Sequence, residues 1–173
     1  MRLLKSTVHP SVSASEPRQF TRLTSRAIAL KGTDILLMYT ARYEDFSLPG
    51  GGIDEGESIE QGLIRELQEE TGAQNIKVLG EFGLYEEYRP WYKDDYAVIH
   101  IKSYCYFCSI DEQLGQAQLE HYEQQNGMVA KWVNIYDAIA HNERTLATSE
   151  KQGLSIIRET YLLKEIAKHI TNY

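Results

Sequence analysis

The chain has 173 residues and a formal net charge of −7 at pH 7. Its hydrophobic content of 42% and charged content of 25% are ordinary for a soluble globular protein, and the length fits one domain with a substantial core. The negative charge disfavours non-specific binding to nucleic acid, and no apolar run approaches the roughly 20 residues of a membrane span. Arg2 and Lys5 are not followed by the apolar stretch of a signal peptide, so we expect a cytoplasmic protein.

The first part of the chain predicts an N-terminal segment followed by a hairpin. Residues 1–19 are polar and contain Pro10 and Pro17, which is typical of an arm or an irregular edge segment, whereas residues 20–173 are expected to form one domain. Residues 20–30 and 35–39 are apolar or alternating, and a turn that contains Gly32 separates them. This pattern favours a β-hairpin.

A glycine-rich turn and a helix are predicted next. Residues 48–52 read LPGGG, which ends a short strand and allows the backbone to approach a ligand closely. Ser58 and Gln61 form a capping-box pattern, so the helix is expected to begin near Ser58 and to end at Thr71-Gly72. Its apolar stripe consists of Ile59, Leu63 and Leu67.

Three carboxylates share one face of that predicted helix. Glu66, Glu69 and Glu70 stand at positions i, i+3 and i+4, so they fall within an arc of about 100°. Like charges at i,i+4 destabilise an isolated helix by roughly 0.2–0.5 kcal/mol. A divalent cation reverses this effect, because the carboxylate oxygens then become its ligands. The spacing therefore indicates a metal site rather than a solvated surface helix.

Residues 51–73, GGIDEGESIEQGLIRELQEETGA, resemble the Nudix box. The box has the pattern G-x5-E-x7-R-E-U-x-E-E-x-G-U, and its fixed glycine, arginine and glutamate positions are all matched. Ala73 departs from the pattern, because the family usually has a larger aliphatic residue there. The resemblance covers 23 of the 173 residues and implies an α/β fold, an α/β/α sandwich around a mixed β-sheet.

The resemblance also implies a cofactor and a set of site residues. The expected cofactor is Mg²⁺, with Mn²⁺ as a substitute, bound by Glu66, Glu69 and Glu70 and by the Gly50 carbonyl, with Glu57 contributing through water. Glu66 or Glu70 is expected to act as general base. Arg65 either orients a glutamate through a fixed ion pair, which its position favours, or contacts a substrate phosphate.

The middle of the chain predicts strands and an aromatic loop. Residues 76–87 are typical of one or two strands broken near Gly80–Gly83, residues 86–95 of a polar and aromatic loop, and residues 96–110 of a long strand. Cys105 and Cys108 lie three positions apart in that strand, so they are expected to be free, buried thiols on opposite faces.

The C-terminal third predicts one more strand and two helices. Residues 111–127 are polar and are expected to be irregular, residues 128–135 to form a strand and residues 134–141 a short helix. Residues 149–169 are amphipathic, and Ser149 and Gln152 resemble a second capping box. Leu154 and Ile157 are expected on the apolar face of that last helix.

The predicted function is cleavage of the pyrophosphate bond of a nucleoside diphosphate linked to another moiety. Tyr88 and Trp91 are candidates for stacking on the base. Family members that cleave ADP-ribose carry a proline shortly after the box, and Pro90 lies one position beyond the usual place, which favours an ADP-ribose-like or sugar-nucleotide substrate. Many members add a further glutamate from a later loop, for which Glu120 and Glu123 are candidates.

Several alternatives remain open from the sequence. One is a nucleoside triphosphate pyrophosphohydrolase of the house-cleaning type, and another is a Nudix domain that binds nucleotide without turnover. An isomerase of isopentenyl diphosphate would need a suitably placed catalytic cysteine, which a core strand does not offer. Edge pairing of the N-terminal segment makes a homodimer the expected assembly, with no nucleic-acid or membrane partner.

Overall fold

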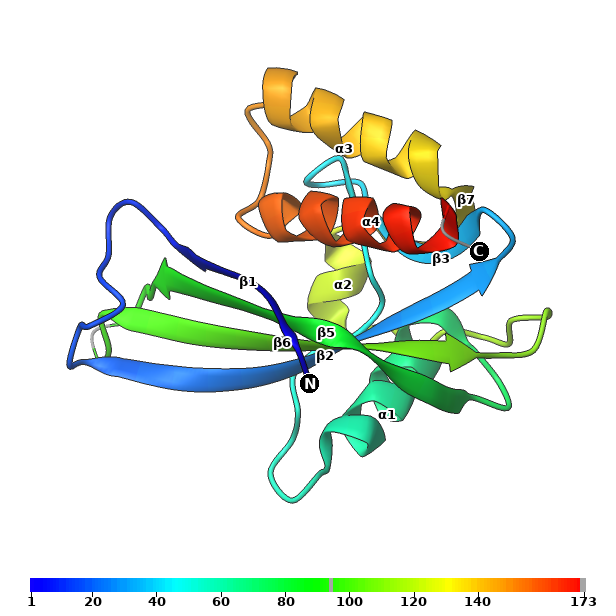
Figure 1. The fold of residues 1–173 in the computed structure, drawn as a ribbon, viewed down its shortest axis with the longest axis horizontal. Helices are drawn as coiled ribbons and strands as arrows, with labels where there is room; N and C mark the ends of the chain where they lie inside the picture. The colour runs from blue at the N-terminus through cyan, green and yellow to red at the C-terminus, as the bar shows by residue number, and fades with distance from the viewer. Residues whose placement is uncertain (94, 172–173) are drawn as a thin grey trace.

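A mixed β-sheet runs through the molecule, and the computed structural model describes residues 1–93 and 95–171. Within this part of the chain the sheet has seven strands in the order β1-β5-β6-β2-β3-β4, with β7 on the other side of β3 (Figure 1). The β1–β5 and β6–β2 pairs are parallel, and the remaining pairs are antiparallel. The strands are β1 (Leu3–Val8), β2 (Gln19–Lys31), β3 (Asp34–Thr40), β4 (Asp45–Ser47), β5 (Lys77–Pro90), β6 (Val98–Ser109) and β7 (Met128–Asn134).

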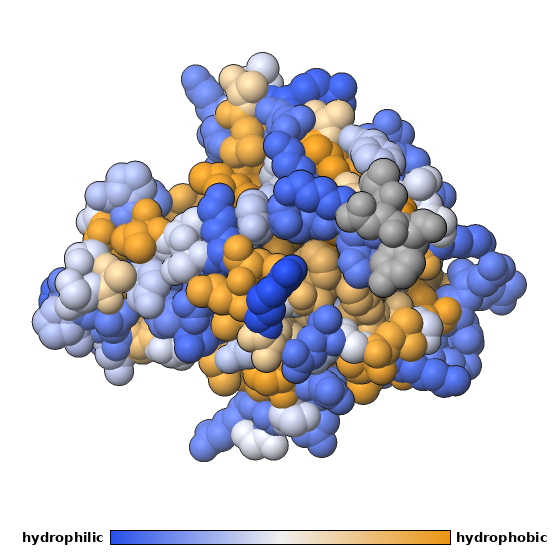
Figure 2. All heavy atoms as spheres, in the orientation of Figure 1, coloured by the Kyte–Doolittle hydropathy of each residue, from blue (hydrophilic) through white to orange (hydrophobic). Residues whose placement is uncertain are grey.

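The N-terminal segment contributes a regular strand to this sheet. β1 pairs in parallel with β5 over Leu3–Val8, so the first part of the predicted arm is an edge strand, while residues 9–18 form the turns that lead to β2. Leu3 and Val8 remain 52% and 47% exposed. Figure 2 shows hydrophobic residues among hydrophilic ones on the face that β1 crosses.

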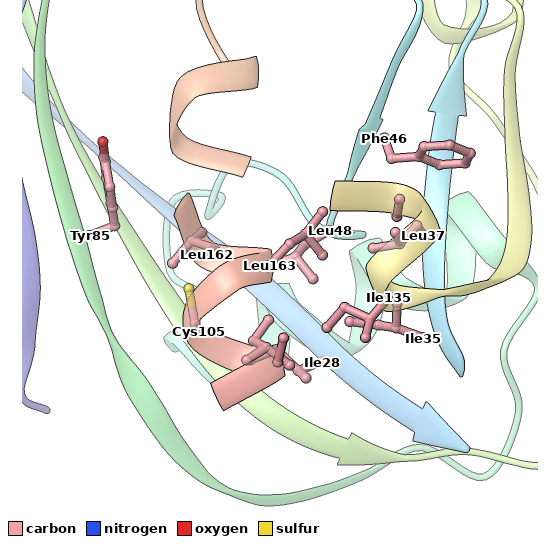
Figure 3. Close-up of a cluster of buried hydrophobic side chains, with 13 residues drawn as sticks. Ile28, Ile35, Leu37, Phe46, Leu48, Tyr85, Cys105, Ile135, Leu162 and Leu163 are labelled. Atoms are coloured by element: carbon pink, nitrogen blue, oxygen red, sulfur yellow. The ribbon is translucent and has the colours of Figure 1, made fainter. Parts of the chain in front are cut away.

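Helices cover both faces of the sheet, which confirms the predicted α/β fold. α1 (Ile59–Thr71) packs on one face, where Leu63 and Leu67 meet Ala27 and Cys108 in one core cluster. α3 (Ile135–Thr148) and α4 (Ile156–Thr171) cover the other face, where Cys105 lies in a second cluster with residues of α4 (Figure 3). The two cysteines are thus buried and free, on opposite faces of β6 as predicted.

The segment that was expected to be an aromatic loop is partly strand. β5 continues through Pro90, which pairs with Val98 at the end of the ladder, so only the residues after Pro90 connect β5 to β6. The polar residues did not predict a strand, because their partners come from other elements. Glu86 lies 3.4 Å from the ammonium of Lys102 on β6, and the buried Glu87 pairs with Arg158 on α4. Register shifts between Val78 and Gly80 and between Glu81 and Gly83 account for the predicted break.

The predicted helix at residues 149–169 was wrong in its first turns. α3 extends to Thr148, residues 149–155 form a connection, and α4 begins at Ile156. The Ser149 hydroxyl accepts the N–H of Lys151 and donates to the Glu44 carboxylate, a local turn that competes with a helix. Leu154 and Ile157 are 50% and 58% exposed, so the buried face consists instead of Ile156, Leu162, Leu163 and Ile166.

The polar stretch before β7 contains a short helix that was not predicted. α2 (His121–Gln125) has a capping box in which the Glu120 N–H donates to the Glu123 carboxylate across 2.7 Å. Apolar periodicity cannot reveal a helix of five residues. Among the described residues, no helix combines the length and the apolar character needed to cross a membrane.

Candidate active site

The glycine turn is held against β2 by backbone hydrogen bonds. The N–H of Ser25 donates to the Gly51 carbonyl (3.0 Å), and the N–H of Ala27 donates to the Pro49 carbonyl (2.9 Å). Gly50 has φ 134°, and a Cβ there would lie 2.1 Å from the Ser25 carbonyl oxygen. Only glycine satisfies both conditions, so the close approach of the turn to β2 depends on this residue.

The caps of α1 confirm the predicted helix and fix the position of its acidic face. Ser58 and Gln61 form the expected capping box, with each side chain bonded to the other's backbone N–H (3.2 and 2.8 Å). Gly72 ends the helix in the left-handed region with φ 71°, and its N–H donates to the Gln68 carbonyl. α1 thereby presents its carboxylates toward the glycine turn.

Gly51 leaves the space that the Glu66 side chain occupies. A Cβ at Gly51 would lie 2.5 Å from Cδ and 2.6 Å from both carboxylate oxygens of Glu66. The Glu66 side chain is 16% exposed. Its burial raises the pKa of Glu66 above the usual range, although Arg65 opposes this shift. The first glycine of the box, Gly51, and Glu66 are therefore matched in shape.

Arg65 connects the acidic residues of the box. Its Nε donates to Glu57 Oε1 (2.7 Å), its Nη1 to Glu66 Oε1 (2.9 Å) and Glu69 Oε2 (3.2 Å), and its Nη2 to the Gly52 carbonyl (3.0 Å). The Arg65 side chain is 27% exposed, so these contacts are partly shielded from water. Of the two roles considered for Arg65, this geometry corresponds to orientation of the carboxylates.

Glu57 lies at the entrance of α1 and is fixed by the same arginine. It accepts two hydrogen bonds from Arg65 and one from the N–H of Asp54 (3.0 Å), which together lower the pKa of Glu57 to about 2. Gly62 lies beside it, because a Cβ there would be 2.5 Å from Ile53 Cδ1 and 3.1 Å from Glu57 Oε2. Glu57 is thus an ionised group with a fixed orientation.

Glu70 differs from the other box carboxylates because it is 5% exposed. The N–H of Gly50 donates to Glu70 Oε2 across 2.6 Å. Burial raises the pKa of Glu70 to about 8, and the nearby carboxylates of Glu123 and Glu66 act in the same direction. A group with this pKa can take up or release a proton near neutral pH.

The structure distinguishes the two candidates for the additional glutamate. Glu123, on α2, is 5% exposed and lines the same cavity as Glu70, whereas Glu120 is exposed at the surface. Glu123 Oε1 accepts a hydrogen bond from the Tyr122 hydroxyl (3.1 Å). Two buried carboxylates from distant parts of the chain thus face one cavity.

That cavity has a volume of about 380 Å³ and lies between the glycine turn, β2 and the start of α4. Its lining contains four arginines and four carboxylates: Arg22, Arg26, Arg89, Arg158, Asp45, Glu70, Glu123 and Glu159. The rings of Tyr43 and Tyr122 also border it. Guanidinium groups recognise phosphate oxygens through several hydrogen bonds at once, so the cavity suits a phosphorylated ligand.

Two of these arginines are fixed by buried ion pairs that the sequence analysis missed. Arg158 is bonded to Glu87 and, across 2.7 Å, to Glu159. Glu159 also accepts the N–H of Leu48 (2.9 Å); burial would raise the pKa of Glu159, but Arg158 and Arg26 hold it below the usual range. Arg89 lies 2.6 Å from Glu87. The sequence contains one indication of these pairs. Glu87 and Arg158 are charged residues within β5 and α4, elements that pack against the core and otherwise bury apolar side chains.

Tyr88 and Trp91 do not line this cavity. Tyr88 stacks on His100, with ring centroids 4.1 Å apart and an interplanar angle of 10°. Trp91 packs edge-to-face against Phe20, with centroids 5.0 Å apart. Of the predicted site residues, Gly50 and Glu70 line the cavity. Arg65 holds Glu57, Glu66 and Glu69 in an ion-pair cluster next to the glycine turn, and the stacking role of the two aromatic candidates stays a prediction.

The donor atoms near the glycine turn suit a hard divalent cation. They are carboxylate oxygens and backbone carbonyls, which Mg²⁺ and Mn²⁺ prefer. Gly51 keeps room for the Glu66 carboxylate, and the repulsion among Glu66, Glu70 and Glu123 is of the kind that a cation relieves. Among the described residues, however, no three His, Cys, Asp or Glu side chains converge into a metal-binding group. Arg65 and the Gly50 N–H hold the carboxylates instead.

Short segments of the chain are similar to curated proteins of known name. An RNA pyrophosphohydrolase of a Sulfurovum species is 57% identical over 37 residues, which cover 21% of this chain and 24% of that protein. Another, of a Nitratiruptor species, is 46% identical over 39 residues, or 22% and 25% of the two chains. The chain thus matches about a quarter of the length of these curated relatives.

Solved structures share the architecture at low identity. A NUDIX hydrolase from Nitrosomonas europaea superposes with a TM-score of 0.56 at 18% identity, covering 86% of this chain and 91% of that one. A UDP-X diphosphatase gives 0.52 at 18% identity, with coverage of 92% and 67%. The family model described as NUDIX domain matches residues 21–153, which include the glycine turn, all of α1 and α2. With this match over most of its length, the chain belongs to the NUDIX domain family.

Proposed function

We propose that the protein is a metal-dependent pyrophosphohydrolase that acts on a nucleoside diphosphate linked to another moiety. The observation that carries this proposal is the cavity in which two buried carboxylates, Glu70 and Glu123, face an arginine-rich wall. Carboxylates that can bind a cation and guanidinium groups that can bind phosphate line the same cavity. A pyrophosphate group with its bound cation is complementary to both kinds of group at once.

The box residues have separate roles in the proposed site. Glu66, Glu69, Glu70 and the Gly50 carbonyl would hold Mg²⁺ or Mn²⁺, with Glu57 contributing through water. The bound ion would neutralise charge on the pyrophosphate and acidify a water molecule. Arg65 orients the carboxylates through the hydrogen bonds described above, which is a positioning role.

The proton of the attacking water passes to a carboxylate in this proposal. Glu70 is the first candidate for this carboxylate, because it is buried at the cavity beside the N–H of Gly50. Glu66, which fills the space beside Gly51, remains the second candidate. Water attacks one phosphorus, the bond from that phosphorus to the bridging oxygen breaks, and the leaving phosphate takes the electron pair while cavity arginines hold its oxygens.

The substrate class is proposed to be ADP-ribose-like or a sugar nucleotide. Pro90, shortly after the box, supports this choice through the family resemblance, and the rings of Tyr43 and Tyr122 at the cavity offer surfaces for a base or a sugar. A nucleoside triphosphate is the second candidate substrate, and the similarity to an RNA pyrophosphohydrolase of Sulfurovum is limited to 37 residues. A domain that binds nucleotide without turnover is the non-catalytic alternative.

A substrate panel tests this function. The purified protein is incubated with Mg²⁺ and ADP-ribose, UDP-glucose, ATP or 8-oxo-dGTP, and the products are separated by ion-exchange chromatography. The proposal expects two monophosphates from a linked nucleoside diphosphate, for example AMP and ribose 5-phosphate from ADP-ribose. Release of inorganic pyrophosphate from a triphosphate supports the second candidate. Tight binding of a nucleotide without any product, with Mg²⁺ or with Mn²⁺ in its place, contradicts an enzymatic role.

We also propose that the protein forms a homodimer through its N-terminal strand. β1 lies at the edge of the sheet, with Leu3 and Val8 about half exposed along it. An unpaired strand edge with apolar side chains favours pairing with a second copy, and twofold dimers are the commonest closed assembly.

A further inference from the structure

Arg26 is bonded to the glycine turn at Gly50, the residue whose positive φ and close approach to β2 require glycine. The Nη1 of Arg26, which projects from β2 toward the cavity, donates a hydrogen bond to the carbonyl oxygen of Gly50. The Nε of Arg26 is buried and has no hydrogen-bond partner among the described residues. A guanidinium that leaves one of its donors unpaired inside a cavity has capacity for a further acceptor.

The contact conflicts with the cation site of the proposed function, on which this inference rests. The Gly50 carbonyl is one of the oxygens that would hold the metal, and the guanidinium of Arg26 carries a full positive charge. Two cations on the one carbonyl oxygen of Gly50, which is buried, repel each other. Binding of the metal to Gly50 therefore requires that Arg26 release this oxygen.

We propose that Arg26 is a substrate-binding residue whose availability depends on the metal. Without the cation, Arg26 bonds to the Gly50 carbonyl and occupies one position of the metal site. When the cation takes that carbonyl, the guanidinium turns into the cavity and donates to a phosphate oxygen of the substrate. The same side chain therefore links the two binding events, and each ligand increases the affinity for the other.

Arg26 is the cavity arginine that can make this exchange. Arg158 and Arg89 are held by the carboxylates of Glu87 and Glu159, so their release would leave buried charges unpaired. Arg22 lies beside Gly52 at the exposed side of the cavity and makes no hydrogen bond to the turn among the described residues. Among the four cavity arginines in the described part of the chain, Arg26 is the one that contacts the Gly50 carbonyl, an oxygen that the metal would use.

Calorimetric titration with Mn²⁺ tests the inference without relying on turnover. Binding is measured in the absence and presence of α,β-methylene-ADP, a nucleotide whose bridging carbon prevents hydrolysis, for the wild type, Arg26→Met and Arg22→Met. We expect Arg26→Met to bind Mn²⁺ alone about tenfold more tightly, because a hydrogen bond from a charged donor is worth about that factor. The increase in Mn²⁺ affinity caused by the nucleotide is expected to fall about tenfold in the same variant.

The Arg22→Met variant is the matched control, since it removes one positive charge from the same cavity. An equal gain in Mn²⁺ affinity in both variants would show a general effect of charge and would overturn the inference. Unchanged coupling in Arg26→Met would overturn it too, while leaving the proposed function intact. A wild-type protein that binds no Mn²⁺ with or without nucleotide contradicts the proposed function as well.

A measurement on the wild type covers the case in which Arg26→Met does not fold. The arginine Nε–H resonances are followed by nuclear magnetic resonance during a titration with diamagnetic Mg²⁺. The inference expects the Arg26 resonance to shift as Mg²⁺ binds and to shift again with α,β-methylene-ADP. An Arg26 resonance that stays unchanged while Mg²⁺ saturates the site overturns it.

Discussion

The Nε of Arg65 donates to Oε1 of Glu57 across 2.7 Å and ties the middle of α1 to the loop that precedes it. The two residues are eight positions apart, so their contact fixes how the helix enters the site. The same guanidinium reaches Glu66, Glu69 and the Gly52 carbonyl. One side chain therefore sets the relative positions of three carboxylates and of the glycine turn.

Replacement of Arg65 by lysine is expected to lower kcat by about 10- to 100-fold, the usual effect of losing a group that orients metal ligands. Lysine keeps the charge but cannot donate along several fixed directions. Steady-state kinetics and Mn²⁺ titration measure the loss, with Arg144→Lys on the exposed face of α3 as control. Equal kcat values for Arg65→Lys and the wild type would contradict the orienting role.

Gly51→Ala is expected to displace the Glu66 carboxylate and to reduce activity by about a hundredfold, since a misplacement of about 1 Å has effects of this size. The added Cβ would lie 2.5 Å from the Glu66 side chain. Gly80→Ala is the matched control, because a Cβ there has no neighbour within 4 Å. Steady-state kinetics and thermal unfolding of both variants separate a loss of activity from a loss of stability. Wild-type activity in Gly51→Ala would show that the space is not needed.

Asp45→Asn is expected to change the pH dependence of stability. Asp45 is 5% exposed, and burial followed by repulsion from Glu159 raises the pKa of Asp45 to about 6. An unfolded aspartate ionises near pH 4, so between about pH 4 and 6 the folded state binds more protons and wild-type stability falls as pH rises. The free energy of unfolding of Asp45→Asn should exceed the wild-type value by on the order of 2–3 kcal/mol at pH 7 and by little at pH 4.

Urea unfolding at several pH values measures this difference, with Asp34→Asn at an exposed position as control. A constant difference between Asp45→Asn and the wild type from pH 4 to pH 7 would show that Asp45 ionises at its ordinary pH in the folded protein.

A charge on the edge strand is expected to separate the proposed dimer. Leu3→Glu places a carboxylate on an exposed position of β1, and charged side chains oppose edge pairing. Leu79→Glu, at a position that is 65% exposed on β5, is the matched control. Light scattering should give a dimer mass for the wild type and Leu79→Glu and a monomer mass for Leu3→Glu. A monomeric wild type at micromolar concentration refutes the dimer.

Local patterns in the sequence predicted the hairpin, α1 with both of its caps and the burial of the two cysteines on opposite faces. These features depend on residues close together in the chain, such as Ser58 with Gln61 and Thr71 with Gly72. The end of β5 was missed because the partners that stabilise Glu87 lie on α4, far away in the sequence. The start of α4 was missed because the hydroxyl of Ser149 bonds to Glu44 instead of capping a helix.

The candidate site was predicted only on its acidic side. The box placed Glu66, Glu69, Glu70 and Arg65 on one helix, since all four belong to a single continuous motif. The arginines that line the cavity come from β2, β5 and α4, and no local sequence pattern connects Arg26 with Arg158. Glu123 could be named only as one of two candidates, and its burial distinguishes it from Glu120.

The most direct test of the account is the turnover of the Glu70→Gln variant beside the wild type, with and without EDTA. The substrate is the one that the panel identifies, and circular dichroism checks that the variant is folded. The account predicts that Glu70→Gln lowers kcat by several orders of magnitude, that EDTA abolishes wild-type activity and that added Mg²⁺ restores it. Full turnover by Glu70→Gln, or wild-type activity undiminished by EDTA, would contradict it.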